Sequence, residues 1–521
     1  MSNLSTASRA EGTGQRAVSW APLAVILCGT FVYVLDFFIV NVALPSIQRS
    51  LGASPAAIEW VVAGYGLTSA AFLVTGGRLG DHYGRKRVFC AGLFAFTVAS
   101  ALCALAPDAG FLVAARLAQG VAAAIMAPNV LSILGTTYTG AARVKAISIY
   151  GMVMGVAAVA GQLVGGLLIA ANPAGLGWRV IFWVNVPVGI AAVALARRFV
   201  PESRGAVRGR LDLRGAALFT TALVAIVLPL LDGRAHGWPA WSWACLAAGP
   251  VLLAVFAAHL RATARRGAQP LLDPAIFAVP AFRAGLACQV LFWCQQAASY
   301  LLLALYLQQG RGLSPVSSGG VFSVLAAGYL ATSFRAPALT MRFGRRVVAA
   351  GAVTAALGNA ALVIAVLADA GPSLGSTGPV AALFPGLFLL GAGQGLCITP
   401  LTTTVLSHAD PSRAGSVSGA LSTAQQVGNA IGVAVTGVVF YGLLGHGDSY
   451  AAAYRWSLTE MGVLLAGVAA LTFIMPRARL STGAGGAGAD GPSAGGADAG
   501  GADAGGASAG AGRRAVPARE R

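Results

Sequence analysis

The stretch GGRLGDHYGRKRVF, residues 76–89, places basic residues, one aspartate and several glycines between two long apolar runs. In a soluble protein such a stretch would be an ordinary surface turn. In this chain it is a short polar interruption, because 57% of the 521 residues are hydrophobic and only 10% are charged. Soluble domains carry about 25% charged residues, so the composition predicts an integral membrane protein built mostly from spanning helices.

Apolar runs of about 20 residues, the length that a helix needs to cross a bilayer, recur along the chain. They predict an all-α polytopic membrane protein with fourteen transmembrane helices. Their approximate ranges are 21–44, 57–77, 88–106, 111–135, 144–170, 179–199, 214–232, 240–260, 281–308, 317–335, 346–368, 380–405, 415–443 and 458–475. The first run has no small-residue cleavage site at its end, so we expect a retained helix rather than a signal peptide.

The net charge of +18 is concentrated in alternate loops between these runs. The residues on that side are Arg78, Arg85, Lys86, Arg87, Arg143, Lys145, Arg197, Arg198, Arg204, Arg208, Arg210, Arg261, Arg265, Arg266, Arg342, Arg345 and Arg346. The positive-inside rule then predicts a multi-pass protein of the cell membrane with both termini in the cytoplasm. Nucleic-acid binding, which such a charge would suggest in a soluble protein, is not expected.

An aromatic-Gly-basic-basic pattern occurs twice, in LGDHYGRKRVFCAG (79–92) and LTMRFGRRVVAAG (339–351), with Met341 at the position of Asp81. Two such halves predict a parallel repeat of six-helix bundles. The expected divisions are a cytoplasmic N-terminus at 1–20, an N-terminal six-helix bundle at 21–199, a linker with two inserted helices at 200–280, a C-terminal six-helix bundle at 281–476 and a disordered Gly/Ala-rich cytoplasmic tail at 477–521.

Enzymatic chemistry is not expected. The five histidines lie at or near loops and far apart, and the seven cysteines are scattered through apolar runs without metal-binding spacing. The chain has no GxxxxGK[ST] phosphate loop, so it does not hydrolyse ATP by that route. No metal or organic cofactor is predicted. A sensor would need a folded soluble domain, and no loop is long enough to form one.

The pattern G-x-L-x-D-x-x-G-R-K-x-x-F resembles the signature of the major facilitator superfamily. It is carried by Gly77, Leu79, Asp81, Gly84, Arg85, Lys86 and Phe89. Gly77 and Gly84 are expected to allow close helix approach and a tight turn, and Asp81 to cap a helix or pair with an arginine. The resemblance implies that this loop latches the outward-facing state while two bundles rock. The alternative is a loop that only sets topology.

The stretch LVAARLAQGVAAA (112–124) matches the family's helix-four pattern and places Arg116 inside a span. An arginine there costs roughly 2.5–3.5 kcal/mol on insertion scales, so we expect it to face a wet cavity or a counter-charge. The resemblance implies a role in proton coupling. Alternatively, Arg116 snorkels to the outer interface.

The stretch GVAAVAGQLVGGLLI (155–169) resembles the helix-five motif of the antiporter branch, which is associated with export. Gly161, Gly165 and Gly166 match it, and small residues at this spacing let helices pack closely. Gln162 replaces the motif's proline, which removes a kink and turns a polar amide towards the substrate path. This departure favours a rival function, a facilitative or uptake permease for a small metabolite on the same fold.

Further stretches resemble the fourteen-helix drug:proton antiporter family, so that the resemblance spans residues 20–476. They are VLDFFIVNVALPSI (34–47), GWRVIFWVNVPVG (177–189), YLQQGRGLSP (306–315) and residues 391–440. The resemblance implies proton-coupled efflux of a drug or antibiotic by alternating access, driven by the proton gradient alone. The expected partners are the small-molecule drug, protons and the lipid bilayer, with the chain acting as a monomer.

Asp36 is the acidic residue placed deep inside the spans of the first half. A carboxylate in a low-dielectric setting can take up and release protons near neutral pH. We expect Asp36 to be protonated from outside, releasing a bound drug, and to deprotonate towards the cytoplasm, with Arg116 tuning it or sharing its water path. The alternative is a structural hydrogen bond to a neighbouring helix.

The substrate site is expected between the halves near the membrane midplane. Its candidate lining residues are Tyr33, Phe37, Phe38, Tyr65, Trp293, Gln296 and Tyr300. Aromatic side chains suit flat amphiphilic drugs, although such residues also face lipid or core. Because few acidic residues lie inside the spans, neutral or anionic compounds are favoured over cations.

Overall fold

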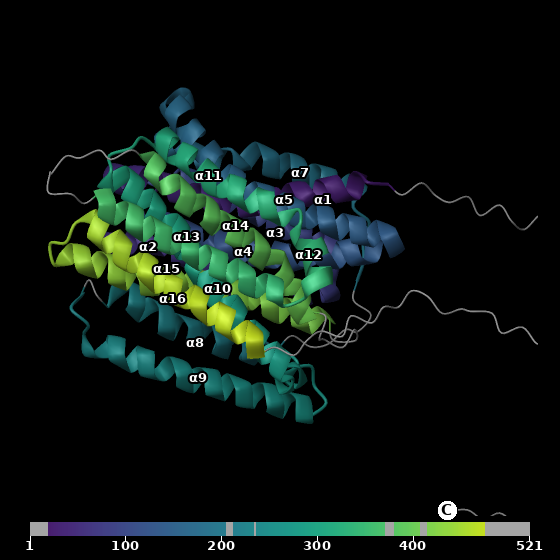
Figure 1. Ribbon diagram of the computed structural model, residues 1–521. Helices are drawn as coiled ribbons and strands as arrows, with labels where there is room; N and C mark the ends of the chain where they lie inside the picture. Colours follow the sequence, from purple (N-terminus) through teal and green to yellow (C-terminus); the bar gives the residue numbers. More distant parts are fainter. Residues whose placement is uncertain (1–18, 205–211, 234–235, 370–379, 407–413, 475–521) are drawn as a thin grey trace, which may run out of the picture. The chain divides into compact units, whose positions relative to one another are not determined.

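The computed structural model describes residues 19–204, 212–233, 236–369, 380–406 and 414–474. Within this part of the chain, 14 helical segments are long and apolar enough to cross a membrane. The predicted number and the all-α class are confirmed, and the protein is a multi-pass membrane protein (Figure 1). The tail predicted at 477–521 and most of the N-terminal segment at 1–20 lie outside the described residues, as does part of the predicted linker.

The helices follow the hydropathy pattern closely. Their bounds are α1 Ala21–Leu51, α2 Pro55–Tyr83, α3 Arg85–Ala104, α4 Ala109–Thr137, α5 Gly140–Ala171, α6 Val180–Trp183, α7 Asn185–Phe199, α8 Leu213–Asp232, α9 Ala240–Arg265, α10 Pro280–Leu305, α11 Pro315–Ser333, α12 Ala336–Phe343, α13 Arg346–Asp369, α14 Phe384–Leu406, α15 Ala414–Gly445 and α16 Tyr450–Ile474. A π-helical turn, η5, continues α10 over Tyr306–Gly310. Short 3₁₀ turns precede α6, α10 and α14.

Side-chain caps and glycines set several of these boundaries. Ser54 accepts a hydrogen bond from the N–H of Ala57 and is followed by a proline, which together start α2. Asp108 caps α4 in the same way, through the N–H of Phe111 at 2.8 Å. Gly52 ends α1 in the left-handed conformation at φ +59°, where a side chain would be strained.

Long helices pack against one another within each half. In the N-terminal half (α1–α7), α4 packs on α2 and α3, and α1 packs on α5. In the C-terminal half (α10–α16), α14 packs on α11 and α13, and α15 packs on α10. The halves meet where α2 packs on α15 and α5 on α11. The inserted α8 contacts α2 and α15, whereas α9 packs mainly on α8 and is little buried (Figure 1).

Two glycine turns serve to name the ends of the bundle. Successive spanning helices alternate in direction, so α1 and α2 meet at the Gly52 end, and α2 and α3 meet at the Gly84 end. At the Gly52 end the halves are tied by side chains of η5. The amide of Gln308 donates to the carbonyl of Val42 at 2.9 Å, and the amide of Gln309 donates to Gln48 at 2.8 Å.

The polar stretch at 76–89 is not an extended loop, which corrects the expectation drawn from the sequence. Helix α2 continues to Tyr83 and α3 begins at Arg85, so Gly84 alone separates them. Gly84 makes this turn at φ +109°, and Gly344, in the second copy of the pattern, also has a positive φ of +56°. This last part of α2 packs closely against α4, where Asn129 donates to the carbonyl of Gly76 at 3.2 Å.

Candidate functional site

A buried ion pair lies inside the N-terminal half. Nη1 of Arg116, on α4, is 2.5 Å from Oδ2 of Asp36, on α1, and both side chains are 0% exposed. Arg116 also donates from Nε to the carbonyl of Val61 at 3.0 Å, and its guanidinium lies 4.4 Å from the ring centroid of Tyr65. Arg116 therefore does not snorkel to an interface. It faces the counter-charge that the cost of burying an arginine led us to expect.

Two amides complete the shell of Asp36, and sequence reasoning missed both. Gln119 donates to Oδ1 of Asp36 at 3.0 Å and accepts from Arg116 at 2.7 Å. Asn185, on α7, donates to the same Oδ1 at 2.7 Å and to the hydroxyl of Ser100 at 3.0 Å. A signal existed for Gln119, because it follows Arg116 by three residues and must share its helix face. Asn185 carries no comparable local signal.

This cluster gathers side chains from α1, α3, α4 and α7 around one carboxylate. The paired charges sum to zero, and the pair is closed to solvent in this conformation. A carboxylate so placed can gain or lose a proton only when a rearrangement admits water to it. Replacing the carboxylate of Asp36 by a neutral group would leave the guanidinium of Arg116 buried without a counter-charge, which would destabilise the fold.

Glu59 is a second buried acid of the N-terminal half, with 1% of its surface exposed. It lies on α2 beside Gly437 of α15, towards the Gly52 end. The sequence analysis singled out Asp36 alone because Glu59 is near the start of its span, where an acid costs less. Burial against another helix could not be read from hydropathy.

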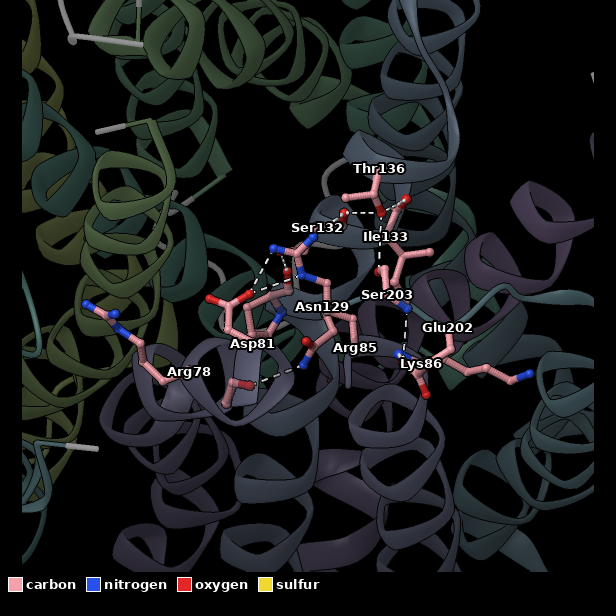
Figure 2. Close-up of polar contacts among 12 residues, drawn as sticks. Arg78, Asp81, Arg85, Lys86, Asn129, Ser132, Ile133, Thr136, Glu202 and Ser203 are labelled. Atoms are coloured by element: carbon pink, nitrogen blue, oxygen red, sulfur yellow. Dashed lines mark hydrogen bonds and ion pairs between the residues drawn. The ribbon is translucent and has the colours of Figure 1, made fainter. Parts of the chain in front are cut away.

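The signature residues form a polar cluster at the Gly84 end (Figure 2). Arg85 donates from Nε and Nη2 to Oδ1 of Asp81, at 3.1 and 2.8 Å, and from Nη1 to the carbonyl of Ser132 on α4 at 3.4 Å. Asp81 thus pairs with the neighbouring arginine, one of the two arrangements expected for it. The pair spans the α2–α3 turn and fastens it to α4.

The start of α3 is capped by residues that follow α7 rather than by Asp81. The N–H of Arg85 donates to the carbonyl of Ser203 at 2.8 Å, and the N–H of Lys86 donates to the carboxylate of Glu202 at 3.1 Å. A Cβ on Gly84 would lie 2.7 Å from Oε1 of Glu202, so glycine is needed here for space as well as for its φ. Sequence reasoning missed Glu202. Lys86 Nζ donates to the carbonyl of Arg197 at 2.7 Å.

Close approach of α2 to α4 depends on Gly76 and Gly80 rather than on Gly77. A Cβ on Gly80 would overlap the side chain of Asn129, and one on Gly76 would overlap the backbone of α4 at Ala124. A Cβ on Gly77 would meet Pro128 at 3.5 Å, an ordinary contact. Helix geometry explains the pair, because positions 76 and 80 lie about 40° apart around the helix axis, whereas 77 lies about 100° from 76, at the edge of the contact.

The side chain of Arg78 extends away from the Asp81–Arg85 pair (Figure 2). It donates from Nη1 to Gln269 at 2.8 Å and from Nη2 to the carbonyl of Pro270 at 3.2 Å, in the segment after α9. The same segment is held by Asp212, which accepts from the N–H of Leu271 at 3.1 Å. The inserted helix pair is therefore fastened to the end of α2 that carries the signature.

The antiporter-motif residues of α5 lie between α1 and α11. A Cβ on Gly161 would lie 3.0 Å from Phe38, one on Gly165 would lie 2.8 Å from Ile39, and one on Gly166 would lie 2.7 Å from the carbonyl of Pro315. Gln162 is 1% exposed, and its Nε2 donates to the carbonyl of Phe38 at 3.1 Å. The amide that replaces proline thus ties α5 to α1.

Most candidate lining residues are buried where α1, α2, α10 and α11 approach one another. The rings of Phe37 and Tyr65 lie 5.8 Å apart, and the ring of Phe38 meets that of Tyr300 edge-on at 5.1 Å. Trp293 and Gln296 are buried on α10, on the same face as Tyr300. Tyr33 is half-buried on α1, one turn before Phe37.

The helical bundle with its buried ion pair and glycine-hinged signature is that of a polytopic membrane transporter. The sequence profile of the Major Facilitator Superfamily matches residues 26–433, and the chain belongs to this family.

Curated relatives match most of the chain. The probable actinorhodin transporter of Streptomyces coelicolor is 38% identical over 84% of this chain and 75% of its own length. The cephamycin export protein of Amycolatopsis lactamdurans is 34% identical over 93% of this chain and 98% of its own length. The puromycin resistance protein of Streptomyces alboniger is 35% identical over 88% and 90%, respectively. These relatives are named as transport, export and resistance proteins, not as enzymes.

Solved structures share the fold. An auto-inhibited peptide transporter of the POT family has a TM-score of 0.63 at 16% identity, covering 88% of this chain and 97% of that one. A bacterial homologue of the lysosomal transporter Spinster, in an inward-facing conformation, has a TM-score of 0.57 at 18% identity, covering 87% and 97%.

Proposed function

We propose that this protein exports a drug or antibiotic across the cytoplasmic membrane, exchanging it for protons by alternating access. The exporter function is supported by relatives that are named as antibiotic export and resistance proteins and that align with most of the chain. Proton coupling is supported by one observation above the others, the fully buried pair of Asp36 and Arg116.

In this mechanism Asp36 is the proton carrier. While it is ionised, Arg116, Gln119 and Asn185 hold it between α1, α4 and α7. Protonation removes the charge that pairs with Arg116, which weakens the ties between these helices and favours a rearrangement. A proton that moves down the gradient supplies the work, since one charge crossing 100 mV is worth about 2.3 kcal/mol.

The orientation belongs to the same proposal. Basic residues gather at the Gly84 end, so the positive-inside rule puts this end and both termini in the cytoplasm. Signature residues Gly84, Asp81, Arg85 and Lys86 then form the cytoplasmic hinge between α2 and α3, and the η5 contacts close the outer end. We expect the monomer to be the working unit.

The decisive experiment is loading of everted membrane vesicles with an antibiotic panel, before and after the proton gradient is collapsed. Loading that stops on collapse supports a proton antiporter. Asp36→Asn should then abolish loading, whereas Asp108→Asn, the same chemical change at a surface helix cap, should keep it because Asn also caps helices. Unchanged loading by Asp36→Asn would refute the proposed carrier.

A facilitative or uptake permease is the second candidate, favoured by Gln162 at the position of the motif's proline. Its amide donates to the carbonyl of Phe38 and holds α5 against α1 in this conformation. Movement of substrate that ignores the gradient would select this function over antiport.

A further inference from the structure

The C-terminal half presents a polar but uncharged face towards the other half. Its members on α10 follow one another at helical spacing and are Gln289, Trp293, Gln296 and Tyr300. All are buried, and hydrogen bonds join them into one surface with α14. Gln289 accepts from Trp293 at 3.0 Å and donates to Thr402 at 3.3 Å, and the hydroxyl of Tyr300 donates to Gln394 at 3.3 Å.

Three amides around this face keep one hydrogen-bonding atom without a protein partner in the described structure. These atoms are Oε1 of Gln296, Nε2 of Gln394 and Oδ1 of Asn429. They come from α10, α14 and α15, and Asn429 lies where α15 meets α2 of the opposite half, beside Gly66. Natural proteins seldom leave buried polar atoms unsatisfied, so a ligand that supplies the missing hydrogen bonds explains them.

Aromatic rings from both halves adjoin these amides. Tyr300 stacks on Phe322 of α11 with ring centroids 5.8 Å apart, and meets Phe38 of α1 edge-on at 5.1 Å. Flat rings are therefore the surfaces against which a ligand near Gln296 and Gln394 would pack.

Negative charge is lacking on this face. Helices α10, α11, α14 and α15 contain no Asp or Glu in their described sequences. On the facing half, Asp36 is already paired with Arg116, and Glu59 lies beside Gly437, about two helical turns from Gly66 towards the Gly52 end. Glu460 of α16 borders a groove on the surface of the helices, lined by exposed residues such as Trp456.

We propose that the substrates are uncharged, ring-bearing molecules with carbonyl and hydroxyl groups, held by the free amide atoms of Gln296, Gln394 and Asn429 between aromatic side chains. This inference rests on the proposed export function. A carbonyl accepts from an amide N–H and a hydroxyl donates to an amide oxygen, so both kinds of free atom are used. A permanent cation would lose its hydration without gaining a carboxylate, and attraction to aromatic faces compensates only in part.

The test compares two fluorescent probes in everted vesicles, a monohydroxyflavone and the permanent cation ethidium. We expect the wild type to load the flavone and not ethidium. Gln394→Leu and Gln296→Leu should each raise the apparent KM for the flavone about tenfold, the effect of one lost hydrogen bond. Gln295→Leu is the matched control, because Gln295 also has a free Oε1 but lies on the side of α10 that faces α16, where its Nε2 donates to Ser299 at 2.6 Å.

The methyl ether of the same flavone shows whether an amide contacts the hydroxyl directly. In the wild type, methylation should raise the apparent KM about tenfold, and in one of the two Leu variants it should have no further effect. If the glutamines have only a structural role, the rise in apparent KM caused by methylation and the rise caused by the Leu substitution should be additive in both variants. Gln296→Glu should gain loading of ethidium, because it adds the missing carboxylate.

The outcomes separate the substrate class from the export function. Loading of ethidium by the wild type, or additive losses in both variants, would overturn the proposed substrate class and leave export standing. Equilibrium binding of the flavone to the purified full chain provides the second readout. Binding that Gln394→Leu weakens, without any loading of vesicles, would support the substrate class and refute the export function. If the wild type neither binds nor loads the flavone, the proposed substrate class is overturned.

Discussion

At the scale of single residues, the N-terminal half depends on a buried pair whose members cannot be removed independently. Asp36→Asn is expected to affect the fold as well as coupling, because Arg116 has no other carboxylate within its contacts and would remain buried and charged.

Asp36→Asn and Arg116→Gln should therefore each lower the free energy of unfolding by about 3–5 kcal/mol. The double variant should lose less than the sum of the two, because it removes both charges. Thermal unfolding of the purified protein in detergent, followed by tryptophan fluorescence, measures all three. Additive losses would mean that the two side chains do not interact in the folded protein.

The glycines of α2 allow a comparison within one helix. Gly80→Ala should lower transport strongly and reduce stability, because the new methyl group overlaps the side chain of Asn129. Gly77→Ala should leave both nearly unchanged, since the nearest atom to its Cβ is 3.5 Å away. Initial transport rates at matched expression levels check this. Equal effects of the two substitutions would contradict the packing described for α2 and α4.

At the scale of elements, the sequence was sufficient to predict the fourteen spans, because bilayer thickness imposes their length and composition. The cost of burying an arginine also led to the prediction that Arg116 faces a wet cavity or a counter-charge, and the structure contains the counter-charge, Asp36. The sequence could not predict partners contributed by distant parts of the chain, which are Asn185 for Asp36, Glu202 for the start of α3, and Gln269 for Arg78. Nor did periodicity reveal the π-helical turn η5, because its apolar pattern continues that of α10.

The turn η5 should control opening at the Gly52 end. A π-helical turn adds a residue to the helix and is common at functional sites. Here it carries Gln308 and Gln309, which reach Val42 and Gln48 of α1. Gln308→Leu combined with Gln309→Leu should make a cysteine placed at Ile47, which is 0% exposed beside Gln48, react several-fold faster with a membrane-impermeant maleimide. Gln295→Leu, at a distance from this contact, serves as the control, and equal reactivity in all three proteins would refute the gate.

The segment after α9 should keep its hold on the bundle throughout the physiological pH range. Burial raises the pKa of the Asp212 carboxyl, but hydrogen bonds from His259 and from the N–H groups of Gly215 and Leu271 outweigh it, and the pKa lies below its usual range. A carboxyl whose pKa is lower in the folded than in the unfolded protein stabilises the fold at any pH above its unfolded-state pKa. This contribution is lost only as the pH falls through the lower, folded-state pKa.

Hydrogen exchange at the Leu271 amide, corrected for its intrinsic rate, should therefore show constant protection between about pH 5 and pH 8. Asp212→Ala should lose this protection, whereas Asp212→Asn should keep part of it, because an amide oxygen still accepts a hydrogen bond. Protection that disappears as the pH falls from about 8 to 5 would mean that Asp212 does not hold this segment.

At the scale of the whole molecule, the halves are hydrogen-bonded to each other through η5 at the Gly52 end, and the signature cluster at the Gly84 end lies within the N-terminal half and its linker. The Asp81–Arg85 pair therefore stiffens one half, while the glutamines close the interface. Alternating access then requires these interface contacts to break as the cytoplasmic ends approach each other.

Spin labels at two pairs of positions test this exchange, in a chain whose seven native cysteines are replaced. Tyr83 and Met341, 55% and 70% exposed, report on the Gly84 end, and the exposed Ser50 and Ser317 report on the Gly52 end. Lowering the pH should protonate Asp36, shorten the distance between the labels at Ser50 and Ser317, and lengthen the distance between those at Tyr83 and Met341, because the protonated carrier has to turn from the outer to the cytoplasmic side. The Asp36→Asn variant should show the low-pH distances at every pH, because its side chain is always neutral. Distances that change together, or that still respond to pH in Asp36→Asn, would place the coupling group elsewhere, and Glu59 would be the next residue to replace.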